Sequence, residues 1–191
     1  VRSHLLMGTL TKPAQQASNM GMNRLLAALF LLTLAIAQPS PAAADMNEGI
    51  AAYKRGDYAA ALIELRPLAE QGNSDAQFYL GIMYYNGQGV PQDYSEAVKW
   101  YRKAAGQGIA IAQNNLGFMY DEGRGVPQDY AEAVKWYRKA AEQGDASAQL
   151  NLGVKYQHGQ GVPQDYVQSH MWSNLAASQL GANEFPALEV L

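Results

Sequence analysis

The sequence GVPQDYSEAVKWYRKAAGQG occupies residues 89–108, and almost the same sequence returns at residues 125–144 as GVPQDYAEAVKWYRKAAEQG. A third copy begins at residue 161 as GVPQDYVQSHMWSNLAAS and then diverges. Successive copies start 36 residues apart. A fixed period of this size is typical of supersecondary units that stack in an array, because each unit has an apolar face that only its neighbour can cover.

Each unit is expected to contain a pair of helices, called here the A helix and the B helix. Ala76, Leu80 and Tyr84 lie four residues apart, so they share one face of the first A helix. Gly81 flanks that face, where a missing side chain lets another helix approach closely. The A helix should end at the loop 86–89, whose glycines accept positive φ. The equivalent positions in the later copies are Ala112, Leu116, Tyr120 and Gly117, then Ala148, Leu152, Tyr156 and Gly153.

The B helix is expected to begin at Asp93. The Asp93 carboxylate can cap the first turn, and Glu96 can bond back to the N–H of Asp93, as in a capping box. Gly108 should end the helix in the left-handed conformation. The capping residues recur as Asp129 with Glu132 and as Asp165 with Gln168, and the terminal glycine recurs as Gly144.

A basic stripe follows the outer side of the B helices. Lys99, Arg102 and Lys103 lie opposite the apolar face, and they recur as Lys135, Arg138 and Lys139. A glutamate stands three residues before the first lysine in both copies. We therefore interpret the stripe as a solvated outer face rather than a ligand site.

A shorter relative of the unit precedes the first full copy, at residues 46–72. Its loop is reduced to residues 54–56, and Pro67 should kink the second helix or end it early. Terminal units of helical arrays are often atypical in this way.

The start of the chain is typical of a secretory signal peptide. A basic residue, Arg24, precedes an apolar block at residues 25–37, which is shorter than the ~20 residues of a membrane span. Proline and small residues follow, ending in an Ala-x-Ala pattern. A buried core helix is the less favoured interpretation. We expect an exported protein, periplasmic or secreted in a bacterium, with no stable membrane anchor after cleavage.

The boundaries of this leader are placed at residues 1–44. Translation is expected to start at Met20 or Met22, and cleavage is expected after Ala44, with Ala37 as the second choice. Residues 45–191 then form the mature helical repeats.

The composition argues against several classes of function. A net charge of −3 gives no electrostatic reason to expect a nucleic-acid partner. The absence of cysteine excludes disulfides, thiolate metal sites and a lipid-modified cysteine. His4, His158 and His170 are not paired with a serine motif or at zinc-ligand spacing. We predict no catalytic residue, no cofactor and no metal.

The repeating pattern Ala-x3-Leu-Gly-x2-Tyr-x2-Gly-x-Gly-Val-x2-Asp-x3-Ala-x2-Trp-Tyr resembles the Sel-1-like repeat, a relative of the tetratricopeptide repeat. Residues 73–108 and 109–144 match throughout, and residues 145–181 match as far as Trp172. The resemblance implies an all-α, right-handed solenoid whose concave side, lined by the A helices, binds partner proteins or peptides. Some cysteine-rich secreted relatives are assigned penicillin binding or weak β-lactam hydrolysis. That activity, or binding of peptidoglycan fragments, is the alternative function.

The variable positions of the A helices give the site hypothesis. Framework positions repeat between copies, whereas recognition positions need not. The middle column of the set is apolar in every copy, so it can also be interpreted as facing the core. The groove residues predicted to contact a peptide or protein partner are Phe78, Ile82, Tyr85, Asn114, Phe118, Asp121, Leu150, Val154 and Gln157. A cell-envelope scaffold with cell-wall association is a further interpretation.

The end of the array, residues 182–191, leaves alternatives open. Either this tail turns back so that Phe185, Leu188 and Leu191 cover the last unit, or the sequence is truncated, or two chains associate there.

Overall fold

The computed structural model describes residues 44–180, all of them helix or connecting loop, with no strand in that range. The apolar block of the leader, the expected start and the tail lie outside these residues. The helices are α2 (Met46–Lys54), α3 (Tyr58–Glu70), α4 (Ser74–Asn86), α5 (Tyr94–Gly106), α6 (Ala110–Glu122), α7 (Tyr130–Glu142), α8 (Ala146–His158) and α9 (Tyr166–Leu180).

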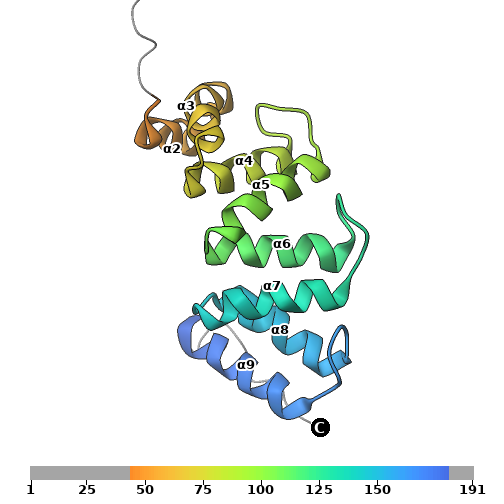
Figure 1. The fold of residues 1–191 in the computed structure, drawn as a ribbon. Helices are drawn as coiled ribbons and strands as arrows, with labels where there is room; N and C mark the ends of the chain where they lie inside the picture. The colour runs from red at the N-terminus through yellow and green to blue at the C-terminus, as the bar shows by residue number, and fades with distance from the viewer. Residues whose placement is uncertain (1–43, 181–191) are drawn as a thin grey trace, which may run out of the picture. The chain divides into compact units, whose positions relative to one another are not determined.

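Each helix packs against the next one along the chain, which confirms the expected stack of helix pairs (Figure 1). The A helices are α4, α6 and α8, the B helices are α5, α7 and α9, and α2 with α3 forms the shorter first pair. The long loops that join A to B lie on the same side of the stack in Figure 1. The architecture is therefore an α-solenoid.

The core follows the predicted faces. The repeated alanine and leucine of every A helix are 0% exposed, from Ala76 and Leu80 to Ala148 and Leu152. On the B helices, Tyr101 and Tyr137 are buried against them. The half-buried Tyr84, Tyr120 and Tyr156 accept hydrogen bonds at their hydroxyls from Arg66, Arg102 and Arg138 of the preceding B helix.

The glycine in each A helix lies where a tyrosine crosses it. A Cβ added to Gly117 would lie 2.7 Å from Cδ1 of Tyr137, and one added to Gly81 would clash with the ring of Tyr101. In the third unit the neighbour is Ser173, whose Oγ would lie 2.8 Å from a Cβ on Gly153. The expected close approach of two helices at this glycine is confirmed.

The loop and cap geometry agrees with the sequence in all but one contact. Gly87 and Gly89 have φ of 70° and 72°, and the Asp93 carboxylate accepts a hydrogen bond from the N–H of Glu96. The predicted return bond from Glu96 is wrong. The N–H of Asp93 donates instead to the carbonyl of Tyr84, at the end of the A helix, and the Glu96 carboxylate pairs with Lys99.

Pro67 does not end α3 early. The helix continues to Glu70, three residues beyond the proline. The carbonyl that loses its helical donor belongs to Ile63, and the Ile63 side chain is 72% exposed, so this side of the helix faces solvent. Water can satisfy a carbonyl there, which explains why the proline is tolerated.

The last B helix, α9, differs from α5 and α7 in the residues that it exposes. The loop of the following unit covers Tyr94 and Tyr130, because Gly125 and Gly161 lie against their backbones. The equivalent Tyr166 is exposed, as are three further apolar residues of α9: Val167, Met171 and Leu175. None of the helices within residues 44–180 has both the length and the hydropathy of a membrane span.

Replacing Gly117 with alanine should lower the free energy of unfolding by about 1–2 kcal/mol. The added methyl group would overpack the contact with Tyr137, and this cost exceeds the gain in helix propensity from glycine to alanine. Urea denaturation followed by circular dichroism measures this difference. Gly106→Ala is the matched control, since nothing lies within 4 Å of a Cβ at that position of α5. An unfolding midpoint unchanged by Gly117→Ala would contradict the close packing described here.

Candidate functional site

The predicted groove residues come from three successive A helices and differ in exposure. Val154 is 43% exposed, and Asp121 is buried at 9%. The others are half-buried: Phe78, Ile82, Tyr85, Asn114, Phe118, Leu150 and Gln157. Ile82 and Phe118, from the middle column, also pack against the core. The core-facing interpretation therefore holds for these two side chains, and a partner contact along the column stays a prediction.

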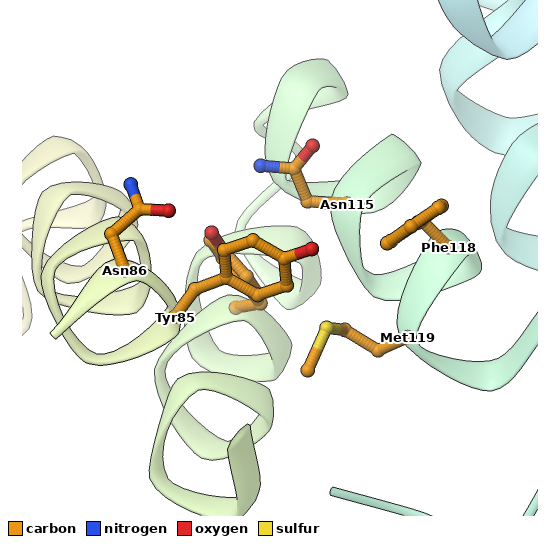
Figure 2. A pocket seen from close by; sticks show the side chains of 6 residues that line it. Tyr85, Asn86, Asn115, Phe118 and Met119 are labelled. Atoms are coloured by element: carbon orange, nitrogen blue, oxygen red, sulfur yellow. The ribbon is translucent and has the colours of Figure 1, made fainter. Parts of the chain in front are cut away.

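The junction between the first two full units brings Tyr85 and Phe118 together. Tyr85 at the end of α4 reaches toward α6, where its ring meets Phe118 edge-on, with 6.5 Å between centroids (Figure 2). The Tyr94 ring of α5 lies 5.3 Å from Tyr85. Beside them is a pocket of about 280 Å³, lined by Tyr85, Asn86, Tyr101, Asn115, Phe118 and Met119.

Arg124 completes this junction, and the sequence analysis did not single it out. Its Nη1 donates to the Tyr85 hydroxyl at 2.6 Å, and its Cζ lies 5.2 Å from the Phe118 ring centre and 5.7 Å from that of Tyr94. A guanidinium against aromatic faces is attracted by their negative π-density. The sequence did mark this position as different, because the residues equivalent to Arg124 in the other two loops are glutamines, Gln88 and Gln160.

Asp121 belongs to the next junction and is bound within the protein. The Lys155 ammonium donates to its Oδ1 at 2.5 Å, and the Tyr137 hydroxyl donates to Oδ2 at 3.2 Å. Lys155 also donates to Gln160 at 2.9 Å. A partner contact at Asp121 stays a prediction, but its carboxylate already serves as a link between α6, α7 and α8.

Tyr101 and Tyr137, the buried tyrosines next to these two junctions, stay protonated. Burial raises the pKa of Tyr101, and burial together with the Asp121 charge raises the pKa of Tyr137. Ionising either phenol would place a negative charge in a site with little water. Tyr137 is therefore a dependable hydrogen-bond donor to Asp121 at neutral pH.

A ladder of glutamines also joins the units, and sequence reasoning missed it. Gln77 and Gln113 on the A helices donate to the carbonyls of Ala69 and Ala105 on the preceding B helices. Each accepts a hydrogen bond in turn from the glutamine that caps the end of its own B helix, Gln107 or Gln143. The signal in the sequence was a glutamine directly after the repeated alanine of each full A helix, at the same period as the rest of the framework.

Lysines of the basic stripe contact neighbouring side chains on the same B helices. Lys99 pairs with Glu96 at 2.7 Å and Lys135 with Glu132 at 2.8 Å. Lys103 lies over the Trp100 ring, 4.0 Å from its centre. These contacts agree with its interpretation as a solvated outer face.

The two histidines in the described part of the chain lie apart from any group of reactive side chains. His158 ends α8 and His170 lies on α9, and both are exposed. Within residues 44–180, no cluster of three or more histidine, aspartate or glutamate side chains could hold a metal ion.

The 36-residue units match a family model. The model described as Sel1 repeat matches residues 74–109, 110–145 and 146–179, more than half of the sequence. The chain belongs to the Sel1 repeat family. Sel1 repeats generally mediate protein–protein interactions, and proteins built from them are typically non-enzymatic scaffolds.

Solved structures of Sel1 repeat proteins resemble this chain over 70% of its length. One is c5321, a protective antigen present in uropathogenic Escherichia coli strains that displays an SLR fold, at 48% identity and a TM-score of 0.67. Another is a Sel1 repeat protein from Oxalobacter formigenes, at 40% identity and a TM-score of 0.67. The match spans 29% of the first of those chains and 55% of the second. Comparison with curated proteins finds no match.

Replacing Lys155 with methionine, the residue at the equivalent position 119, should lower the free energy of unfolding by about 3–5 kcal/mol, because the buried Asp121 loses its counter-ion. Thermal and urea unfolding measure the loss. Lys99→Met is the control, since the Lys99 side chain is 64% exposed and surface pairs contribute little.

The double replacement Asp121→Tyr with Lys155→Met installs the residues of the preceding junction, Tyr85 and Met119. It should recover most of the stability lost in Lys155→Met. A single variant as stable as the parent would contradict the importance of this ion pair.

Proposed function

We propose that this Sel1 repeat protein is an exported interaction module that binds a peptide or protein segment along the A helices α4, α6 and α8. The observation that carries the proposal is the convergence of Tyr85 and Phe118, from successive units, on a pocket at the predicted groove. The framework residues beside them are fully buried, whereas these side chains keep part of their surface open.

The chemistry of this surface suits recognition. Tyrosine and phenylalanine supply large contact areas for a small loss of side-chain entropy, and binding energy concentrates where an anchor residue fills a pocket. Tyr85 is already held by Arg124 and Tyr94, so little ordering is needed when a partner arrives. Val154 on α8 extends the apolar surface into the third full unit.

Export is part of the proposal and is supported by the leader sequence, with its basic start, short apolar block and Ala-x-Ala end. We expect mass spectrometry of the exported protein to find Asp45 as the first residue. A mature N-terminus before Arg24, or retention of the chain in the cytoplasm, would contradict this. Turnover of the β-lactam nitrocefin above the buffer rate would favour the alternative function.

A photo-crosslinking amino acid at Val154 or Phe118 should give discrete covalent adducts with a partner when the chain is expressed in its own host. The reason is that both positions face the proposed groove. The same amino acid at Lys99 or Lys135, on the outer face, is the matched control. Adducts are detected as shifted bands and identified by mass spectrometry.

Equal crosslinking from the groove and from the outer face would contradict the proposal, as would no adduct from either groove position. Circular dichroism of each variant distinguishes loss of binding from loss of the fold.

A further inference from the structure

Arg124 differs from the residues that occupy its position in the other loops. Gln88 is used within the protein, accepting a hydrogen bond from Tyr53 and donating one to Tyr58. Gln160 accepts a hydrogen bond from Lys155. The Arg124 side chain makes one hydrogen bond, to the Tyr85 hydroxyl, so most of the N–H donors of its guanidinium have no partner among the described residues.

No acidic side chain within residues 44–180 forms an ion pair with Arg124. The ion pairs found in residues 44–180 involve Arg55, Lys99, Lys135 and Lys155, and none involves Arg124. Arg124 is half-buried, and its guanidinium lies near the Tyr85, Tyr94 and Phe118 rings. A cation in this environment attracts an anion more strongly than a fully hydrated one, because less water competes.

The pocket beside Arg124 can accept the neighbouring residue of a ligand. Tyr85 and Phe118 line the pocket and also contact the Arg124 guanidinium. The positive charge therefore lies directly next to the pocket. Asn86 and Asn115 line it too, and their amides supply donors and acceptors for a peptide backbone (Figure 2). The volume of about 280 Å³ leaves room for one large apolar side chain.

We propose that the groove recognises an acidic peptide segment in which an aspartate or glutamate side chain binds Arg124 and an adjacent apolar side chain enters the Tyr85–Phe118 pocket. This rests on the proposed function and names the chemistry of its partner. Planar, bidentate binding of carboxylate is the geometry for which a guanidinium is suited. The sister loops, which carry glutamine at this position, lack that charge.

The test uses two pools of fluorescent peptides, capped at both ends so that no terminal carboxylate is present. One pool has the sequence Gly-X-Glu-X-Gly, where X is leucine, phenylalanine or tyrosine, and the other has glutamine in place of glutamate. The purified full chain should bind the glutamate pool about tenfold more tightly at low salt, as expected for a charge-assisted hydrogen bond. Fluorescence anisotropy measures both affinities.

Arg124→Gln should abolish the preference for the glutamate pool, and it introduces the residue that the sister loops already carry. Arg102→Gln is the matched control, because Arg102 also donates to a tyrosine hydroxyl, that of Tyr120, but lies on the outer face. The Arg102→Gln variant should still bind the glutamate pool more tightly than the glutamine pool. The Nε–H resonance of Arg124 in the unmodified chain should shift with the glutamate pool and not with the glutamine pool.

Equal affinity of the unmodified chain for both pools, or a preference retained in Arg124→Gln, would overturn the assignment. So would failure of both pools to bind. If crosslinks at Val154 still form in those cases, the groove binds a partner of other chemistry and the interaction module stands. If those crosslinks also fail, both proposals are wrong.

Discussion

The structure depends on the contact between a glycine of each full A helix and the residue that crosses it on the B helix. At Gly117 and Tyr137 there is no room for a Cβ, so the ring of one helix lies directly on the backbone of the other. This contact sets the distance between the helices of a pair. Because the distance recurs, the outer surface of one pair presents the same shape to the next, and the array can continue at a constant period.

On this uniform backbone the junctions between units differ in chemistry. Between the short first pair and the first full unit, Gln88 is hydrogen-bonded between two tyrosines. Between the first and second full units, an arginine lies among aromatic rings, and between the second and third the contact is the buried pair of Asp121 and Lys155. The residues that distinguish these junctions lie in the last turns of the A helices or in the loops that follow, where one unit meets the next. A surface built from several units can acquire specificity there without disturbing the repeated core.

The period of the sequence was enough to predict the helix pairs, the core alanines and leucines, the aspartate caps and the glycine contacts, because each is set within one unit and repeats in the next. The junction contacts could not be predicted in the same way. Lys155 and Asp121 are 34 residues apart, and Tyr85 and Arg124 are 39 apart, so each pair meets only once the units stack. Of the candidate site, the sequence indicated Tyr85 and Phe118 but neither Arg124 nor the buried role of Asp121.

The difference between junctions also bears on how nearly identical units find their neighbours. Residues 89–108 and 125–144 are close copies, so their B helices alone give little preference for one A helix over another. If α8 packed in the place of α6, Lys155 would face Tyr85 and the carboxylate of Asp121 would lose its counter-ion. Leaving a buried charge unpaired costs several kcal/mol. A well-packed apolar contact could match the ion pair in stability, but it would not penalise the wrong order so strongly.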